Sequence, residues 1–239
     1  MKILAIDTSA KAASAAVCED GGLLCEMLVN NRITHSETLI PMVQSMLRCS
    51  HLTLEEIDAL AVSTGPGSFT GLRIGIAAIK GLAYALDKPC IPVSTLEALA
   101  HNLLDAEGIV CPVMDARCNQ VYNALFTCQN GALSRLCADR ALMIDELQKE
   151  LETHGSPVFL VGDGAQMCYN KLYQNSDKIR LASPVTVMQR ASSVGCIAAG
   201  LFAQGQTVSS AALAAEYLRL PQAERELRKK QSANGGIGK

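Results

Sequence analysis

Apolar and polar positions in the N-terminal part of the chain alternate in short runs, which are separated by turn residues and by longer apolar stretches. The short runs predict strands at 2–6, 14–18, 23–30, 57–62 and 90–93. The longer stretches predict helices at 34–48, 70–86 and 95–104. Asp20, Gly21 and Gly22 are a hairpin signal between the second and third strands. The predicted order βββαβαβα is typical of an α/β fold.

A polar stretch at 105–108 ends this pattern, and a second pattern follows it. The second pattern predicts strands at 110–114, 120–127, 133–138 and 158–161, and helices at 145–152 and 164–173. Asn130 and Gly131 are the expected hairpin turn within it. Because the order βββαβ occurs in both halves, we expect an internal duplication of structure, although no residue-level repeat is visible.

The C-terminal part of the chain is expected to return to the first half. An alanine-rich stretch at 191–203 predicts a helix, and 213–220 predicts a closing helix or extended arm. The predicted domains are an N-terminal lobe of 1–104 joined by the returning segment 190–220, a smaller lobe of 105–189, and a disordered tail of 221–239. The tail is predicted because its polar, glycine-rich sequence has nothing to bury.

The helices predicted at 34–48 and 70–86 carry more apolar residues than one core-facing stripe requires. Small residues in the second of them would allow another helix to approach closely. Because isolated apolar patches of that size are unusual on a monomer, we interpret the two helices as a partner interface. The residues expected in this interface are Leu39, Val43, Met46, Gly71, Ile74, Gly75, Ala78 and Leu82.

The start of the helix at 34–48 carries two local signals. Thr34, with Glu37 three residues later, is a capping-box pattern. Pro41 lacks the N–H group that would bond the carbonyl of Glu37, so we expect a kink or a later start of the helix.

A glycine-rich loop leads from the strand at 57–62 into the helix that follows. Gly65 and Gly67 flank a proline, so the backbone turns sharply and presents bare amides at a helix start. Two interpretations stay open, a phosphate cradle or a loop that needs glycine only to turn. The spacing matches neither the G-x-G-x-x-G fingerprint nor a Walker loop. For the cradle, the expected nucleotide contacts are Asp7, Thr8, Gly65, Gly67, Ser68 and Asp115.

Composition argues against several classes of function. A net charge of −2 gives no electrostatic basis for tight binding to nucleic acid or to a membrane. Met1 and Lys2 lead directly into the first strand, too short a start for a signal peptide, so we expect a cytoplasmic protein. The apolar stretch at 74–86 contains Lys80 and falls short of the ~20 residues that a membrane span needs.

Cysteine and histidine spacing shows no metal motif. The 10 cysteines include no C-x-x-C pair, and Cys18 and Cys25 are as close as any two of them. The 4 histidines, at 35, 51, 101 and 154, are scattered, and no G-x-S-x-G elbow is present. We therefore expect free, mostly buried thiols, no catalytic residue and no metal.

Five stretches are distinctive in combination. They are 3–9 (ILAIDTS), 35–37 (HSE), 63–75 (STGPGSFTGLRIG), 92–99 (PVSTLEAL) and 114–117 (MDAR), the last followed by Val121 and Tyr122. Together they resemble the bacterial TsaB (YeaZ) family. The resemblance is dense over residues 1–125 and thin from there to Arg219.

This resemblance implies an actin-like (ASKHA) α/β fold of two RNase H-like lobes, each a mixed sheet with flanking helices. It implies a role in making threonylcarbamoyladenosine beside the anticodon of tRNAs. In that role the chain would be the non-catalytic partner of the metal-dependent transferase TsaD, and the ATPase TsaE would join them. The heterodimer would form through the helices at 34–48 and 70–86.

Further partners and cofactors follow from the same resemblance. We expect a homodimer when the chain is alone, contact with tRNA through the complex, and no membrane. We expect no cofactor on the chain itself, with ATP or ADP and Mg²⁺ entering only at the level of the complex.

The TsaD family carries a His-x-x-x-His metal pair after the strand that follows its glycine loop. The positions that correspond here are Thr95 and Leu99, on either side of a retained Glu97. Leucine cannot ligate a metal ion. The resemblance therefore implies that this chain is not itself the transferase.

Two other hypotheses stay open. One is an actin-like ATPase or kinase that acts on its own and uses Asp7 and Asp115 around a nucleotide and Mg²⁺. The other is an RNA-binding module whose contact is the basic cluster at 228–230.

Overall fold

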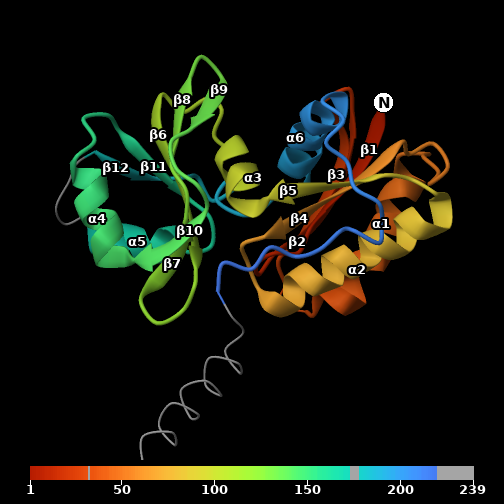
Figure 1. The fold of residues 1–239 in the computed structure, drawn as a ribbon, viewed down its shortest axis with the longest axis horizontal. Helices are drawn as coiled ribbons and strands as arrows, with labels where there is room; N and C mark the ends of the chain where they lie inside the picture. The colour runs from red at the N-terminus through yellow and green to blue at the C-terminus, as the bar shows by residue number, and fades with distance from the viewer. Residues whose placement is uncertain (32, 173–177, 220–239) are drawn as a thin grey trace, which may run out of the picture.

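Two mixed β-sheets form the cores of two lobes, which lie side by side in Figure 1. The chain enters the second lobe after helix α3 (Thr95–His101) and returns to the first lobe through helix α6 (Ala191–Ala203). This computed structural model describes all residues except 32, 173–177 and 220–239. The tail expected at 221–239 lies outside the described residues.

Five strands form the first sheet in the order β3-β2-β1-β4-β5. They are β1 (Lys2–Asp7), β2 (Ala13–Glu19), β3 (Gly22–Val29), β4 (Ala59–Gly65) and β5 (Cys90–Ser94). β1 pairs antiparallel with β2 and parallel with β4. The hairpin between β2 and β3 turns at Asp20 and Gly21, whose φ angles are 49° and 82°. This left-handed backbone confirms the turn signal in the sequence.

Helices cover both faces of the first sheet because successive strand residues point to opposite sides. Leu4 of β1 faces the helices α1 (His35–Cys49) and α2 (Phe69–Leu86), whereas Ile3 faces α6. The central strands are therefore apolar on both faces, which explains their nearly continuous hydrophobic runs.

The second sheet repeats the strand order of the first as β10-β7-β6-β11-β12, and this repetition confirms the expected duplication. Its strands are β6 (Gly108–Asp115), β7 (Gln120–Asn123), β8 (Phe126–Gln129), β9 (Ala132–Arg135), β10 (Arg140–Met143), β11 (Val158–Val161) and β12 (Ile179–Leu181). Helices α4 (Ile144–Glu152) and α5 (Ala165–Leu172) pack against one of its faces.

The hairpin formed by β8 and β9 is an addition to the repeated order and corrects one prediction. Ala124 and Leu125 divide the strand expected at 120–127 into β7 and β8. β7 pairs with the C-terminal half of β6 and β8 with its N-terminal half, so the two cannot form one straight strand. The hairpin turns at Asn130 and Gly131, with φ of 50° and 74°, which confirms that turn signal.

Helix α1 begins after Thr34, but the predicted capping box does not form. Thr34 Oγ1 bonds with Ser36 Oγ at 3.1 Å and makes no hydrogen bond to the helix backbone. The helix continues through Pro41 to Cys49, so the later start was the wrong expectation. Pro41 lies on the exposed side, where water can bond the carbonyl that lacks an N–H donor.

Helix α3 lies between the two sheets and packs on both. Leu96 and Leu99 join an apolar cluster with Val110 of β6, whereas Ala98 joins the cluster under α6. Just after α3, Asn102 forms hydrogen bonds that link the segment entering the second lobe to the segment returning from it. Its Nδ2 donates to the carbonyls of residues 186 and 188 at 2.8 and 2.7 Å, and its Oδ1 accepts from the hydroxyl of residue 193 at 2.6 Å.

The N-terminus of α6 is capped by side chains of the first sheet. Glu26 of β3 accepts hydrogen bonds from N and Oγ of Ser192 at 3.0 and 2.8 Å, and it forms an ion pair with Arg190. Ser14 Oγ accepts from Ala191 N at 2.9 Å. Because N–H groups at a helix start otherwise lack partners, these bonds hold the returning helix on the sheet.

We expect Glu26→Ala to lower the free energy of unfolding by about 2–3 kcal/mol, because it removes a cap of α6 and leaves Arg190 without its carboxylate. Urea denaturation followed by circular dichroism measures this loss. The matched control is Glu19→Ala at the exposed end of β2, which should change the value by less than about 0.5 kcal/mol. Equal effects of the two variants would contradict the capping role.

Candidate functional site

Asp7 ends β1 with its side chain fully buried. Its carboxylate accepts hydrogen bonds from N and Oγ of Ser9 at 2.9 and 2.7 Å, and another from Ser63 Oγ. Burial raises the pKa of the Asp7 carboxyl, and these hydrogen bonds oppose the rise. The carboxyl group is thus surrounded by partners from the chain itself.

The glycines of the loop lack side chains, and the backbone of the chain itself occupies the space that side chains would fill. A Cβ atom on Gly67 would lie 2.6 Å from the carbonyl oxygen of Ser9, and one on Gly71 would overlap the carbonyl of Thr8. Ser68 N donates to Ser9 O at 2.7 Å, and Thr8 Oγ1 donates to Gly71 O at 2.8 Å. The first turn of α2 therefore packs directly on the end of β1, and this contact by itself requires glycine at these positions.

The C-terminal segment 207–219, which we call the strap, passes over the other side of the loop. Glu216 N donates to Thr64 O at 2.8 Å. Gly65 has a φ of 141°, and a Cβ atom on it would overlap the carbonyl of Glu216. The loop is thus held between the end of β1 and the strap.

Aromatic and arginine side chains fasten the strap to α2 and to the second lobe. The ring of Tyr217 stacks on Phe69 with the centroids 4.0 Å apart, and Arg73 Nε donates to the Tyr217 hydroxyl at 3.0 Å. Arg219 donates to the carbonyl of Ala116 in the second lobe at 2.7 Å. The strap therefore bridges the two lobes as well as covering the loop.

A cleft of about 530 Å³ lies between the lobes and contains part of the predicted nucleotide set. Gly67, Ser68 and Asp115 line this cleft. Asp7, Thr8 and Gly65 do not line it, because they are engaged in the contacts above.

Several ionisable residues outside the predicted nucleotide set also line the cleft, among them Lys11, Arg117 and Asp163. Asp163 follows β11, so its place at a strand end is a signal that the sequence carries. Burial raises the pKa of its carboxyl, to which Gln189 Nε2 donates at 3.4 Å. Lys11 lies in a short loop before β2, for which no pattern in the sequence indicated a site.

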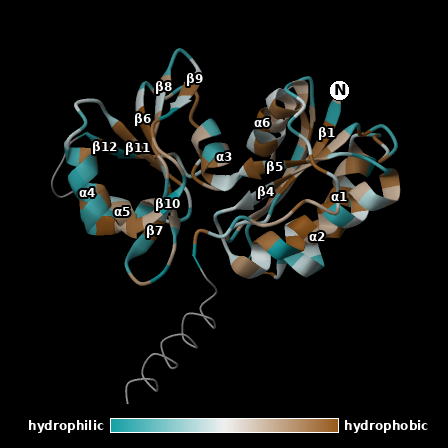
Figure 2. Ribbon diagram, in the orientation of Figure 1, coloured by the Kyte–Doolittle hydropathy of each residue, from teal (hydrophilic) through white to brown (hydrophobic). Residues whose placement is uncertain are grey.

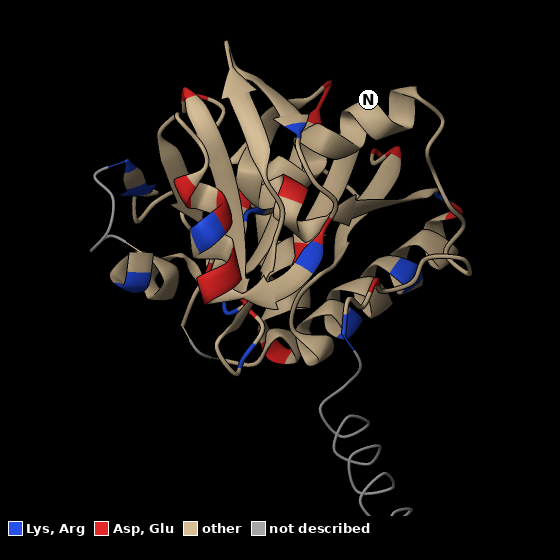
Figure 3. Cartoon of the chain, turned by 60° about the vertical axis from the view of Figure 1, so that its left-hand side comes forward, with Lys and Arg blue, Asp and Glu red and all other residues tan. Residues whose placement is uncertain are grey.

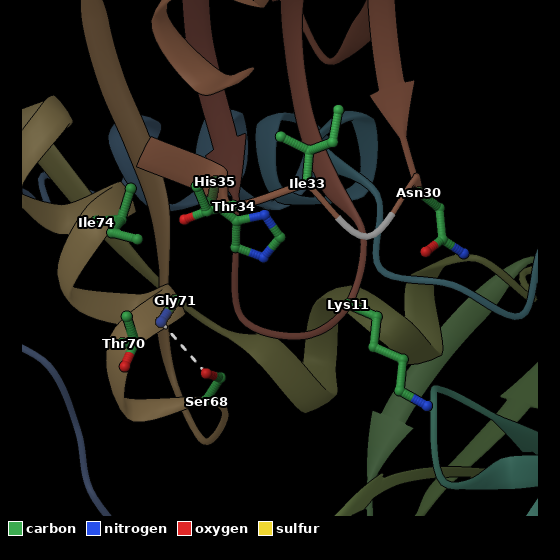
Figure 4. Close-up of a pocket in the computed structure, with 9 residues that line it drawn as sticks. All are labelled: Lys11, Asn30, Ile33, Thr34, His35, Ser68, Thr70, Gly71 and Ile74. Atoms are coloured by element: carbon green, nitrogen blue, oxygen red, sulfur yellow. Dashed lines mark hydrogen bonds between the residues drawn. The ribbon is translucent and has the colours of Figure 1, made fainter. Parts of the chain in front are cut away.

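A second pocket, of about 720 Å³, opens where α1 and α2 begin (Figure 4). Its lining residues are Lys11, Asn30, Ile33, Thr34, His35, Ser68, Thr70, Gly71 and Ile74. The His35 ring bonds the carbonyl of Ala10 through Nε2 at 2.8 Å, and its buried Nδ1 has no partner among the described residues. The pocket is continuous with the outer side of α2 through Ile74.

Within the part of the chain that the structure describes, no group of three or more His, Cys, Asp or Glu side chains is arranged to hold a metal ion. Thr95 and Leu99, which the sequence singled out beside Glu97, are fully buried in α3. Glu97 forms an ion pair with Arg135 at 2.9 Å. Leu99 is therefore part of the core and Glu97 is paired, whereas Thr95 Oγ1 is buried with no hydrogen-bond partner among the described residues.

Five of the residues predicted at the partner interface are turned inward. Leu39, Val43 and Met46 are 1%, 3% and 3% exposed in the core beneath α1. Gly71 and Gly75 are buried against Thr8 at the end of β1. Their burial corrects the prediction that they contact a partner, because the sheet and α2 already cover the apolar stripe of α1.

Ile74, Ala78 and Leu82 are half-buried at the surface of α2 and stay predicted interface residues. The predicted interface set omits the exposed residues beside them, which are Ala77, Gly81, Tyr84 and Ala85. The signal for three of these was present, because Ala77, Gly81 and Ala85 recur at helical spacing. Figure 2 shows brown segments along both α1 and α2.

Helix α2 is apolar well beyond what its buried side needs. Its 18 residues have the length and composition of a membrane span, yet only 33% of them are buried. The helix packs on β4 and its start is capped by Ser68, so it is a helix of the folded lobe. The outer side of α2 is therefore an exposed apolar surface.

Two lobes with one strand order, a glycine loop ahead of α2 and a cleft between the lobes define an actin-like protein of the α/β class. Component A of (R)-2-hydroxyglutaryl-CoA dehydratase from Acidaminococcus fermentans shares the fold, with a TM-score of 0.51 at 12% identity over 85% of this chain and 99% of that one. The expected fold class is confirmed.

Sequence comparison gives the family. A model described as TsaD, tRNA N6-adenosine threonylcarbamoyltransferase, matches residues 20–225. The tRNA threonylcarbamoyladenosine biosynthesis protein TsaB of Escherichia coli K12 is 34% identical over 92% of this chain and 95% of its own length. TsaB of Bacillus subtilis 168 is 35% identical over 68% and 71%. The chain belongs to the TsaB family of tRNA threonylcarbamoyladenosine biosynthesis proteins.

A solved structure agrees with this family. YeaZ from Pseudomonas aeruginosa superposes with a TM-score of 0.78 at 29% identity, over 91% of this chain and 99% of that one.

We expect Gly71→Ala to destabilise the protein by about 1–3 kcal/mol, because the added methyl group meets the backbone of Thr8 and the first turn of α2 must shift. Gly81→Ala in the same helix is the matched control, since a Cβ atom there has nothing within 4 Å. This control should stabilise the helix by about 0.5–1 kcal/mol. Urea titration of both variants measures the difference, and a tolerated Gly71→Ala would contradict the packing role of the loop.

Proposed function

We propose that this chain is a non-catalytic partner subunit in tRNA threonylcarbamoyladenosine biosynthesis. In this proposal it docks a TsaD-type catalytic subunit through the outer side of α2 and the adjoining start of α1. The observation that carries the proposal is the exposed apolar surface of α2, a helix of which only 33% is buried.

The shape of this surface suits another helix. Ala77, Gly81 and Ala85 form a flat strip on which a partner backbone can approach closely, and Ile74 and Leu82 flank the strip. Tyr84, which is 84% exposed, supplies the kind of aromatic side chain that anchors many interfaces.

The electrostatics of the surface point the same way. Lys80 is the one charged residue between positions 74 and 86. Its ammonium group donates to the carbonyls of Ala211 and Leu213 in the strap, at 3.3 and 3.1 Å. The centre of the outer side of α2 is thus free of charge, as the cores of protein interfaces usually are.

Several features support a non-catalytic role. Asp7 is surrounded by hydrogen-bond donors of the chain, the glycine loop is packed between β1 and the strap, and Thr95 and Leu99 stand at the positions of the metal pair. A subunit with these features supports catalysis by contact with another subunit.

The remaining partners belong to the same proposal. Without the catalytic subunit, two copies of this chain pair through the same face of α2. A TsaE-type ATPase joins the heterodimer, and tRNA is contacted through the complex. Figure 3 shows acidic and basic residues scattered over both lobes, and the net charge of −2 supports a tRNA contact that depends on the other subunits. The cytoplasmic location expected from the sequence stays a prediction.

We expect Ala77→Glu to weaken binding to the TsaD-type subunit by at least about tenfold, because it places a charge in the centre of an apolar interface. Calorimetric titration measures the affinity, and an assay of tRNA modification by the reconstituted subunits should show a matching loss. Ala203→Glu at the end of α6, which covers the opposite face of the sheet, is the control and should leave both values unchanged. Full affinity of Ala77→Glu would refute the proposed surface.

The alternative is an actin-like ATPase or kinase that acts on its own. The cleft that brings Ser68, Asp115 and Asp163 together is the observation in its favour. We expect no heat of binding when the isolated chain is titrated with Mg²⁺ and ATP, because Asp7 and the Ser68 amide of the loop are already bonded within the chain. Saturable binding would favour the alternative over the proposed role.

A further inference from the structure

Two cysteines from opposite ends of the chain meet where α6 packs on the first sheet. Cys18 lies in β2 and is buried, and Cys196 lies in α6 and is partly exposed. Figure 1 shows α6 lying against the strands of this lobe. Both thiols are free in the structure.

The backbone geometry brings the two side chains to the same boundary between β2 and α6. A Cβ atom on Gly195 would lie 2.5 Å from Cys18 Sγ and 3.2 Å from Cys18 Cβ, so Cys18 touches the residue just before Cys196. Cys18 Sγ also reaches the carbonyl of Ser192 at 3.6 Å, one helical turn before Cys196. Cys196 Sγ donates to the carbonyl of Gly21 at 3.0 Å, in the turn that follows β2, so both thiols lie where α6 meets the β2–β3 hairpin. A bond between the two sulfurs requires each thiol to turn from its carbonyl partner toward the other.

The two thiols are also chemically unequal. The interaction with Cys18 lowers the pKa of the Cys196 thiol, against the rise caused by burial and by the carboxylate of Glu26. The same interaction raises the pKa of the Cys18 thiol, and burial adds to the rise. Cys196 is therefore the thiol that ionises first and reacts first, and Cys18 keeps its proton.

We propose that Cys18 and Cys196 are an oxidative modification site, which forms an intramolecular disulfide when the protein meets a hydroperoxide such as hydrogen peroxide. The Cys196 thiolate attacks a peroxide oxygen, the O–O bond breaks, and a sulfenic acid and hydroxide form. The Cys18 sulfur then attacks the sulfenic sulfur, the S–O bond breaks, and the departing hydroxide takes the Cys18 proton as water. In total, two thiols lose two electrons and two protons, and hydrogen peroxide becomes two waters.

Other cysteines lack this combination of features. Cys111 and Cys168 in the second lobe are both buried, and burial raises the pKa of each thiol. Cys49 and Cys118 are exposed but lie in different lobes. A nearby cysteine, partial exposure and a lowered thiol pKa thus coincide at Cys196.

The disulfide would join β2 to α6, and with them the beginning and the end of the described fold. The pairing of β2 with β3 is irregular between Val17 and Cys18, so the strand has local freedom to accommodate the bond. Because α6 covers the face of the sheet opposite α1 and α2, oxidation leaves the outer side of α2 unchanged. The inference therefore stands apart from the proposed docking function.

The test is to treat the reduced full-length chain with a few equivalents of hydrogen peroxide near neutral pH, alkylate the remaining thiols and map disulfides by mass spectrometry without reduction. We expect a peptide pair linked through Cys18 and Cys196, and a higher melting temperature that a dithiol reductant reverses. We also expect the rate of Cys196 alkylation to rise with pH, with a midpoint below that of an ordinary cysteine thiol.

Single substitutions test whether this pair, and not a neighbouring cysteine, forms the disulfide. Cys196→Ser, at a partly exposed position, should abolish the linked peptide and the gain in melting temperature. Cys25→Ser is the control, since Cys25 lies opposite Val17 on the neighbouring strand and packs on the other face of the sheet, and should leave both unchanged. A disulfide to Cys25, or sulfinic acid at Cys196 while Cys18 is still alkylated in full, would overturn the proposal.

Discussion

Contact between the first turn of α2 and the end of β1 is the constraint on which the arrangement of the first lobe depends. Ser68 N donates to Ser9 O, Thr8 Oγ1 donates to Gly71 O, and a side chain on Gly71 would displace the backbone of Thr8. This close approach sets the direction in which α2 leaves the sheet. One side of α2 therefore covers β4, and the other side, which includes Ala77, faces outward.

The same contact changes the role of the glycine loop. A loop that binds phosphate must leave its backbone amides free to meet the anion. Here the loop meets the end of β1 on one side and the strap on the other, where Glu216 lies against Gly65. The loop thus orients α2, whose outer side is left exposed and apolar. A subunit that acts by docking fits this arrangement better than an independent nucleotide enzyme does.

Much of the fold was predictable because its signals are local. Alternation and helical spacing placed most elements, and the turn residues at 20–21 and 130–131 marked two hairpins. The division between β7 and β8 was missed because 120–127 is a single run in the sequence, and only its pairing with two halves of β6 divides it. The candidate interface was found as a pair of helices, yet Leu39 and Met46 were assigned to the wrong side. Apolar residues on a helix do not say which of them the sheet will cover.

The sequence by itself determined the strand and helix order, the left-handed turns, the excess of apolar residues on α2 and the family resemblance, since all of these depend on residues close together in the chain. Only the tertiary structure decided which atoms meet. In the folded chain Asp7 is buried among hydroxyl groups, the glycine loop packs against the chain's own backbone, and Cys18 lies against the helix that carries Cys196. The physical reason is that these contacts join positions far apart in the sequence, and the packing of β1, α2, α6 and the strap sets their distances.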